Sequence, residues 1–146
     1  MAITQAIANS FKKQLLEGDH NFASAGGDKF KIALYTSSAT LNSATTVYSN
    51  SQEVSNTGQY VTGGGVLVNA GTSITAGVAR CDFNDRSFTG VTLTARGALI
   101  YNTSSATPNS AVAVLDFGAD KTATSGTFTI QFPAATSTAA ILRISG

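Results

Sequence analysis

The chain of 146 residues has few side chains that could perform chemistry, and they do not form a known catalytic pattern. His20 is the one histidine and follows Asp19, so the two could act as the base and orienting acid of a nucleophilic site. No serine lies in a G-x-S-x-G elbow that would supply the nucleophile. We therefore interpret His20 as a solvated or hydrogen-bonding loop histidine, and we expect no catalytic residues.

Metal and thiol chemistry are equally poorly supported. Asp82, Asn84 and Asp85 resemble a fragment of an oxygen-rich metal loop, but Arg86 stands where further ligands and a glycine would be expected, which favours a hairpin turn. Cys81 is the one cysteine and shares the inward register of its strand, so we predict a small core residue. One Cys and one His cannot complete a tetrahedral zinc site, and we expect no metal and no cofactor.

Two further sets of side chains fit binding or turn roles. Tyr35, Tyr48 and Tyr60 could stack on sugars, but Trp, the usual platform for this contact, is absent, so packing or interface roles are favoured. Asp116 and Asp120 bracket a glycine in a pattern typical of loop caps rather than of a paired acid and base.

Composition limits the classes of partner. The formal net charge is +1 and the nine basic residues are scattered, so no cluster is available to neutralise phosphates and we expect no nucleic acid partner. The N-terminal apolar residues are interrupted by polar ones, which fits neither a signal peptide nor a membrane span. We expect one domain, made in the cytoplasm and kept there until it meets a partner.

The beginning of the chain has a helical pattern. Ile3, Ile7, Phe11 and Leu15 recur every four residues and predict an amphipathic helix near residues 4–17 that ends at Gly18. A short helix is marginal in water, so it must dock either on its own sheet or on a neighbouring subunit. We divide the chain into an N-terminal helical arm, residues 1–20, and a β-sandwich domain, residues 21–146.

From Phe30 onward the period changes to two. Short alternating segments follow one another to Ile144, and the segments 97–101 and 111–115 are apolar on both faces, as central strands are. Residues 36–58 form a polar stretch typical of a long loop. The three glycines 63–65 suit a tight turn, and Asn69, Gly71, Thr72 and Ser73 continue the turn chemistry. The pattern predicts an all-β fold, a two-layer antiparallel β-sandwich or jelly roll of about eight strands with one N-terminal α-helix.

Five segments of the chain resemble a known group of proteins. They are residues 11–16 (FKKQLL), 30–36 (FKIALYT), 96–102 (RGALIYN), 111–121 (AVAVLDFGADK) and 126–133 (GTFTIQFP). Together they resemble small virion-associated proteins of tailed bacteriophages, which are similar to capsid decoration, or cement, proteins. The segments are strand cores and turns, so the resemblance implies a non-enzymatic structural protein and transfers no catalytic residue.

The resemblance implies partners and a location. We expect binding to the major capsid protein or to other virion proteins on the capsid surface, with assembly in the host cytoplasm and no membrane contact. The alternative is a module of the neck, tail or fibre that attaches virion parts or recognises host glycans. We also expect a homo-oligomer, such as a trimer. The predicted partner interface comprises Ile7, Phe11, Leu15, Tyr48 and Val54.

Overall fold

In the part of the chain that the structure describes, the fold is a two-layer arrangement of eight strands and one helix. The computed structural model describes residues 2–133 and 140–145. Residue 1 of the predicted range 1–20, and residues 134–139 and 146 of the predicted range 21–146, therefore lie outside the described residues. The elements are β1 (Ala6–Ile7), α1 (Asn9–Leu16), β2 (Phe30–Tyr35), β3 (Gly65–Val66), β4 (Asn69–Thr75), β5 (Val78–Phe83), β6 (Arg86–Asn102), β7 (Ser110–Ile130) and β8 (Leu142–Ile144). Antiparallel pairing gives sheets ordered β1-β7-β6-β2-β3 and β4-β5-β8, which confirms the predicted all-β sandwich with one helix.

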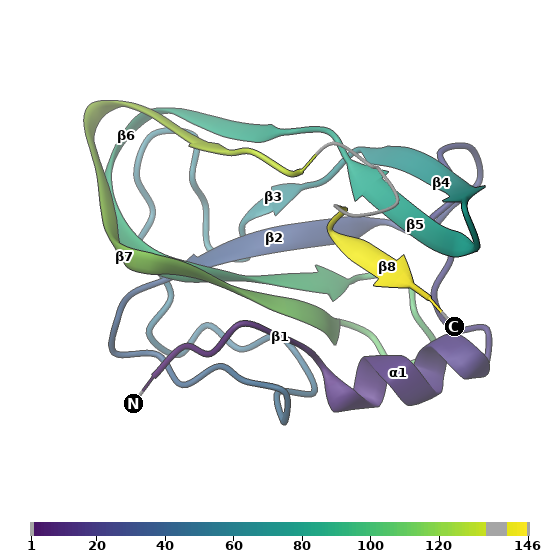
Figure 1. Ribbon diagram of the computed structural model, residues 1–146. Coiled ribbons are helices and arrows are strands. Elements are labelled where there is room, and N and C mark those ends of the chain that lie inside the picture. Colours follow the sequence, from purple (N-terminus) through teal and green to yellow (C-terminus); the bar gives the residue numbers. More distant parts are fainter. Residues whose placement is uncertain (1, 134–139, 146) are drawn as a thin grey trace.

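A long hairpin, β6 and β7, belongs to the five-stranded sheet and bends sharply along its length. In Figure 1 the two strands run together along the top of the molecule, bend, and continue beneath it beside β2. At the bend the pairing passes from Ala95 with Lys121 to Gly97 with Asp116, so the register skips residues 117–120 of β7. The sequence pattern predicted separate strands here, whereas bulges let one pair of strands turn the corner without ending.

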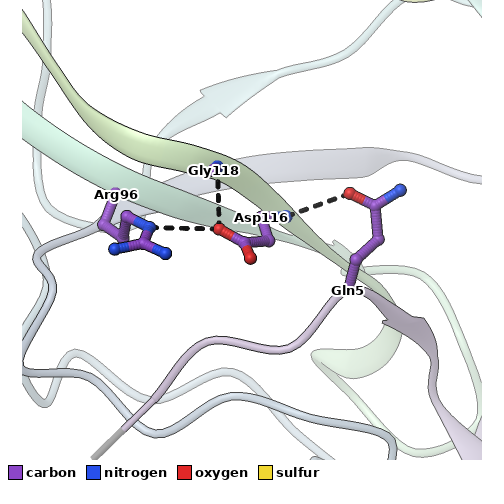
Figure 2. A network of polar contacts seen from close by, with 4 residues as sticks. All are labelled: Gln5, Arg96, Asp116 and Gly118. Atoms are coloured by element: carbon purple, nitrogen blue, oxygen red, sulfur yellow. Dashed lines mark hydrogen bonds and ion pairs between the residues drawn. The ribbon is translucent and has the colours of Figure 1, made fainter.

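A polar network holds this corner (Figure 2). Asp116 Oδ1 accepts hydrogen bonds from Arg96 Nε at 3.1 Å and from the backbone N–H of Gly118 at 2.9 Å. The backbone N–H of Asp116 donates to Gln5 Oε1 at 3.2 Å. Gly118 has φ of +81°, a conformation that glycine adopts without strain. The predicted loop cap at Asp116 therefore exists, but it stabilises a bend within β7 rather than a loop between strands.

The centre of the five-stranded sheet is buried on both faces, as predicted for residues 97–101 and 111–115. Ala98, Leu99 and Ile100 are consecutive and have no exposed surface, so both faces of β6 are covered here. The long loop 36–58 contributes Leu41 and Val54 to the same core. The polar composition of residues 36–58 predicted a long loop, and these two apolar side chains anchor that loop to the core.

The helix is shorter than predicted. Residues 6 and 7 pair with β7 as β1, and the N–H of Thr4 donates to the carbonyl of Leu41, so the backbone before Asn9 is used in β pairing rather than in a helix. The predicted stop at Gly18 is confirmed, with φ of +78°. The ring of Phe11 packs against Phe22 with centroids 5.9 Å apart, so the helix docks on its own domain.

Two predicted turns lie elsewhere. Residues 69–73, predicted as a turn, form β4, because β5 offers them a pairing partner; the turn comes at Ala76 and Gly77, both with positive φ. Asn84 and Asp85 do not close a hairpin, since β5 and β6 belong to different sheets. The glycine turn is confirmed: Gly63 and Gly64 have φ of +100° and +84°.

Gly64 and Gly118 allow a matched test of space against backbone strain. Both have φ near +80°, but a Cβ on Gly64 would lie 1.8 Å from the carbonyl oxygen of Ile32, whereas a Cβ on Gly118 would meet nothing within 4 Å. We expect Gly118→Ala to lower the free energy of unfolding by about 1 kcal/mol from strain alone. Gly64→Ala should lower the free energy of unfolding by about 3 kcal/mol or more, because the backbone of Ile32 would have to move away from the new Cβ. Urea unfolding of both variants checks this, and equal losses would contradict it.

Candidate functional site

All four tyrosines of the chain gather around Glu53 and its loop. The hydroxyl of Tyr60 donates to Glu53 Oε2 at 2.6 Å, and the hydroxyl of Tyr48 donates to Oε1. The N–H of Gly63 donates to Oε2 at 2.8 Å, and the hydroxyl of Tyr101 donates to the carbonyl of Gly63. The carboxylate thus ties the long loop to the glycine turn and the sheet.

The tyrosines are locked as neutral hydrogen-bond donors. Burial raises the pKa of Tyr60 and of Tyr48, and the carboxylate of Glu53 adds to both shifts. Burial and the charge of Glu53 raise the pKa of Tyr101 to about 12. Tyr35 and Tyr60 are almost completely buried, so they cannot stack on a sugar, and the predicted packing role applies to them.

The histidine is the centre of a second buried network. His20 is 7% exposed, its Nε2 lies 2.9 Å from Gln14 Oε1, and its Nδ1 lies 2.9 Å from Asn102 Nδ2. The amide of Asn102 also donates to Asp28 Oδ2 at 2.8 Å. Burial lowers the pKa of His20, while the charges of Asp28 and Asp19 oppose that shift. The ring is a neutral structural link, which agrees with the hydrogen-bonding role expected for it.

The remaining candidate chemical groups do not converge. Asp82 Oδ1 accepts from the N–H of Phe83, and Asp85 Oδ1 accepts from the N–H of Phe132, so the two carboxylates serve different backbone segments. Cys81 is buried, as predicted, and burial together with Asp82 raises the pKa of its thiol to about 12. Within residues 2–133 and 140–145, no three His, Cys, Asp or Glu side chains are grouped so that they could hold a metal ion.

A groove of about 1120 Å³ lies between α1 and the β4-β5-β8 sheet, and we call it the α1 groove. Buried residues Phe11, Phe22 and Cys81 line it. Three large apolar side chains that also line it are exposed: Leu16 by 91%, Ile74 by 71% and Ile144 by 59%. Covering one such side chain completely is worth about 1.5–3 kcal/mol. The groove can therefore bind apolar surface.

Strand register explains why this apolar surface is open. Cys81 pairs with Leu142, and both are buried against the core. Two residues farther along each strand, and hence on the same face, Ala79 pairs with both Ile74 and Ile144. This second row, which we call the Ile74–Ile144 row, lies beyond the core. The small sheet thus extends past the part of the domain that covers its inner face.

The predicted interface residues separate into two groups. Ile7, Phe11 and Leu15 all line the α1 groove, so the structure brings the helical stripe to one open surface. Phe11 itself is only 3% exposed and Val54 only 6%, because each is part of the core of its own domain. Their predicted role at an interface stays a prediction. Tyr48 is half-buried, stacks on Tyr101 at 4.7 Å, and lies outside the groove.

Several important residues escaped the sequence analysis. Glu53 lay in a polar loop and Asn102 at a strand end, with no signal of burial in the residues around them. Leu16 lies off the helical stripe, and Ile74 directly follows a segment interpreted as a turn. An isolated isoleucine in a run of Gly, Thr and Ser is the one signal that could have drawn attention to Ile74.

Comparisons with protein families, with curated proteins and with solved structures found no match for this chain. Among the residues described by the structure, no helix has the length and apolar character needed to cross a membrane. The candidate site therefore rests on the geometry of the α1 groove.

Removing the carboxylate of Glu53 should loosen the long loop. Glu53→Ala leaves the hydroxyls of Tyr48 and Tyr60 and the N–H of Gly63 without their acceptor, so we expect the free energy of unfolding to fall by about 2–4 kcal/mol. Glu17→Ala is the control, because Glu17 pairs with Lys13 on the surface of α1 and its loss should be barely measurable. Urea unfolding measures both; a similar effect of the two substitutions would count against the structural role of Glu53.

Stability should depend on pH through His20. Because burial holds the pKa of His20 below its ordinary 6.5, the unfolded chain takes up a proton before the folded one does. The free energy of unfolding should therefore fall as the pH is lowered from about 7 to about 5. His20→Gln should flatten the dependence in this interval, whatever its absolute stability. Thermal unfolding across the interval tests this, and an unchanged slope in the variant would assign the dependence to other groups.

Proposed function

We propose that the chain is a non-enzymatic structural protein of a tailed bacteriophage virion, and specifically a capsid decoration protein that binds and stabilises the major capsid shell. The single observation that carries the proposal is the α1 groove, where Leu16, Ile74 and Ile144 remain exposed beside a well-packed domain. Exposed apolar side chains gathered on one surface are typical of protein interaction sites. The sequence resemblance to virion-associated proteins supplies the class of partner.

The roles of the ionisable side chains support a structural protein. The carboxylate of Glu53 is engaged by tyrosine hydroxyls, His20 is held by two amides, and Asp116 accepts from Arg96 and Gly118. Each of these groups has a partner in the fold. A rigid sandwich in which polar groups stabilise loops and corners is suited to carrying load between capsid subunits.

The proposed setting follows from this role. The protein would occupy the outer capsid surface, with virion assembly in the host cytoplasm, and would bind the major capsid protein. A homo-oligomer, such as a trimer at a local threefold position, would strengthen weak contacts through multivalency. Neither nucleic acid nor membrane has a part in this proposal.

Copy number in purified virions tests the proposal. A decoration protein repeats over the shell, so its amount should be of the same order as that of the major capsid protein. Quantitative staining of separated virion proteins, with the major capsid protein as internal standard, gives this ratio. If each particle holds only a few copies of this protein, the decoration role is overturned. That result would support the alternative, a module of the neck, tail or fibre.

A further inference from the structure

The hydrogen bonds around His20 fix where the proton of its ring lies. Asn102 Nδ2 donates to Asp28 Oδ2 at 2.8 Å, and Asn102 Oδ1 accepts from the N–H of Ser104 at 2.8 Å. A carboxylate accepts and a backbone N–H donates, so these two contacts decide which end of the amide is the donor. That donor end also faces His20 Nδ1 at 2.9 Å, so Nδ1 must be an acceptor without a proton.

The other ring nitrogen then carries the proton. Nε2 of His20 donates to Gln14 Oε1 at 2.9 Å, and the amide nitrogen of Gln14 donates to Ser110 Oγ at 3.5 Å. Ser110 Oγ donates in turn to the carbonyl of Thr107. The neutral ring therefore joins α1 to the end of β6 and to the turn before β7, through a chain of donors and acceptors with one consistent direction.

A second proton on the ring has no acceptor in this network. Protonation at Nδ1 would set its N–H against the N–H of Asn102 Nδ2. Turning the amide of Asn102 over would offer Oδ1 to the ring, but it would also set that oxygen against the carboxylate of Asp28. The amide nitrogen would then face the N–H of Ser104, so two hydrogen bonds would be lost for one gained.

The surroundings of the ring do not supply water in place of an acceptor. The ring of His20 packs on Phe11 of α1, with centroids 4.7 Å apart, and on Phe30 of β2, with centroids 6.4 Å apart. The whole residue is 7% exposed. A charged ring without hydrogen-bond partners is costly in such a place, because neither water nor protein solvates it.

Two carboxylates act on the ring. Asp28 precedes β2 and Asp19 lies on the same segment as His20, and both favour the charged ring, but burial outweighs them and keeps the pKa of His20 below its ordinary value. The side chains that α1, β2 and β6 place against the ring are aromatic rings and amides, which carry no charge. Acid therefore acts on this contact through the ring itself.

The two ends of α1 are attached to the domain in different ways. At its start, the N–H of Ala8 donates to the carbonyl of Val112 at 3.0 Å and the N–H of Asn9 donates to the carbonyl of Ser43 at 2.8 Å. Later in the helix, the side-chain hydrogen bonds that reach other described segments come from Gln14 alone, to His20 and Ser110. The start of α1 can therefore serve as a hinge for its C-terminal end.

We propose that His20 is an acid-operated latch, which holds the C-terminal end of α1 on the domain while the ring is neutral and releases that end when the ring is protonated, with the sheets still folded. Release brings the charged ring into water and uncovers Phe22, which α1 covers through Phe11. A helix this short is marginal without its docking contacts, so the released residues also lose helical structure. This inference goes beyond the proposed function and does not depend on it.

Nuclear magnetic resonance of the ring nitrogens tests the network on the full chain. His20 is the one histidine, so its signals need no assignment by mutation. At a pH of about 7 the nitrogen chemical shifts should show a proton on Nε2 and none on Nδ1. A proton on Nδ1, or a ring already charged at this pH, would overturn the network and the latch with it.

Amide hydrogen exchange measures the release itself. Between about pH 7 and about pH 5, the open population of residues 13–17 should rise roughly tenfold, after correction for the intrinsic effect of pH on exchange. The amides of Leu99 and Ile100 in the core of β6 should stay far better protected at both pH values, because the sheets remain folded. An unchanged open population, or equal protection of α1 and β6, would overturn the proposal.

The variant His20→Gln assigns the release to the ring. Glutamine takes up no proton in this interval, so the open population of residues 13–17 should be the same at both pH values, whatever its level. The comparison is made within one variant, so a general loss of stability does not affect it. A rise equal to that of the native chain would attribute the release to other groups and overturn the latch.

A pair of charge-matched variants tests the proton from outside the ring. Asp28→Asn keeps an oxygen acceptor but removes a charge that favours the protonated ring, so the release should shift to lower pH. Asp85→Asn removes the same charge from a carboxylate that accepts from the N–H of Phe132, and it should leave the pH of release unchanged. The same result for both variants would mean that the charge facing the ring does not set the pH of release, and it would overturn the latch.

Discussion

The fold depends on the bend in the β6–β7 hairpin. Residues 97–102 of β6 pair with β2, whereas residues 86–95 lie beyond the bend and, among the described residues, pair with β7 alone. At the bend the ladder must lose four residues of β7 and still resume in register, since a slip of one residue would turn buried side chains outward. The carboxylate of Asp116 meets this need by binding Arg96 and the N–H of Gly118 together. Those bonds lower the pKa of Asp116 and keep it charged at the corner.

Glycine provides the second condition for the bend. A Cβ on Gly97 would lie 2.5 Å from the carbonyl oxygen of Leu115 and 2.8 Å from Ile3 Cγ2. β7 and the N-terminal segment can therefore approach β6 this closely only because residue 97 is glycine. Because Gln5 also accepts a bond from Asp116, the same corner holds the chain before β1 in place. The position of α1, and with it one wall of the α1 groove, follows from this attachment.

The sequence allowed the general architecture to be predicted, because alternating residues such as Phe30, Ile32 and Leu34 are periodic wherever one face is buried. It did not show that β6 and β7 continue through the corner, since Gly97 and Gly118 look like strand ends when tertiary contacts are unknown. The helix was predicted too long for a similar reason. Ile3 and Ile7 fit a spacing of four, but pairing with β7 and the contact to Leu41 use the backbone there.

The candidate site was predictable only where its residues are close in sequence. Ile7, Phe11 and Leu15 come from one short segment, and their periodicity identifies a common face. The other wall is formed by residues 74 and 144, which become neighbours only through their shared pairing with Ala79. Neither residue is periodic with the helix, and no pattern in the sequence links the two residues to each other.

The groove itself is a consequence of unequal lengths in the two layers. The β4–β5 hairpin continues for one further row beyond the residues that the core covers, so its inner face changes from Cys81 and Leu142, which are buried, to Ile74 and Ile144, which are not. Ending the hairpin one row earlier, or placing polar residues in that row, would have removed the exposed apolar area at little expense to the core. Exposed isoleucine adds nothing to the stability of the isolated domain and lowers its solubility. Because the row continues the inner face that Cys81 and Leu142 begin, its exposure follows from the length of the strands and not from a gap in the core.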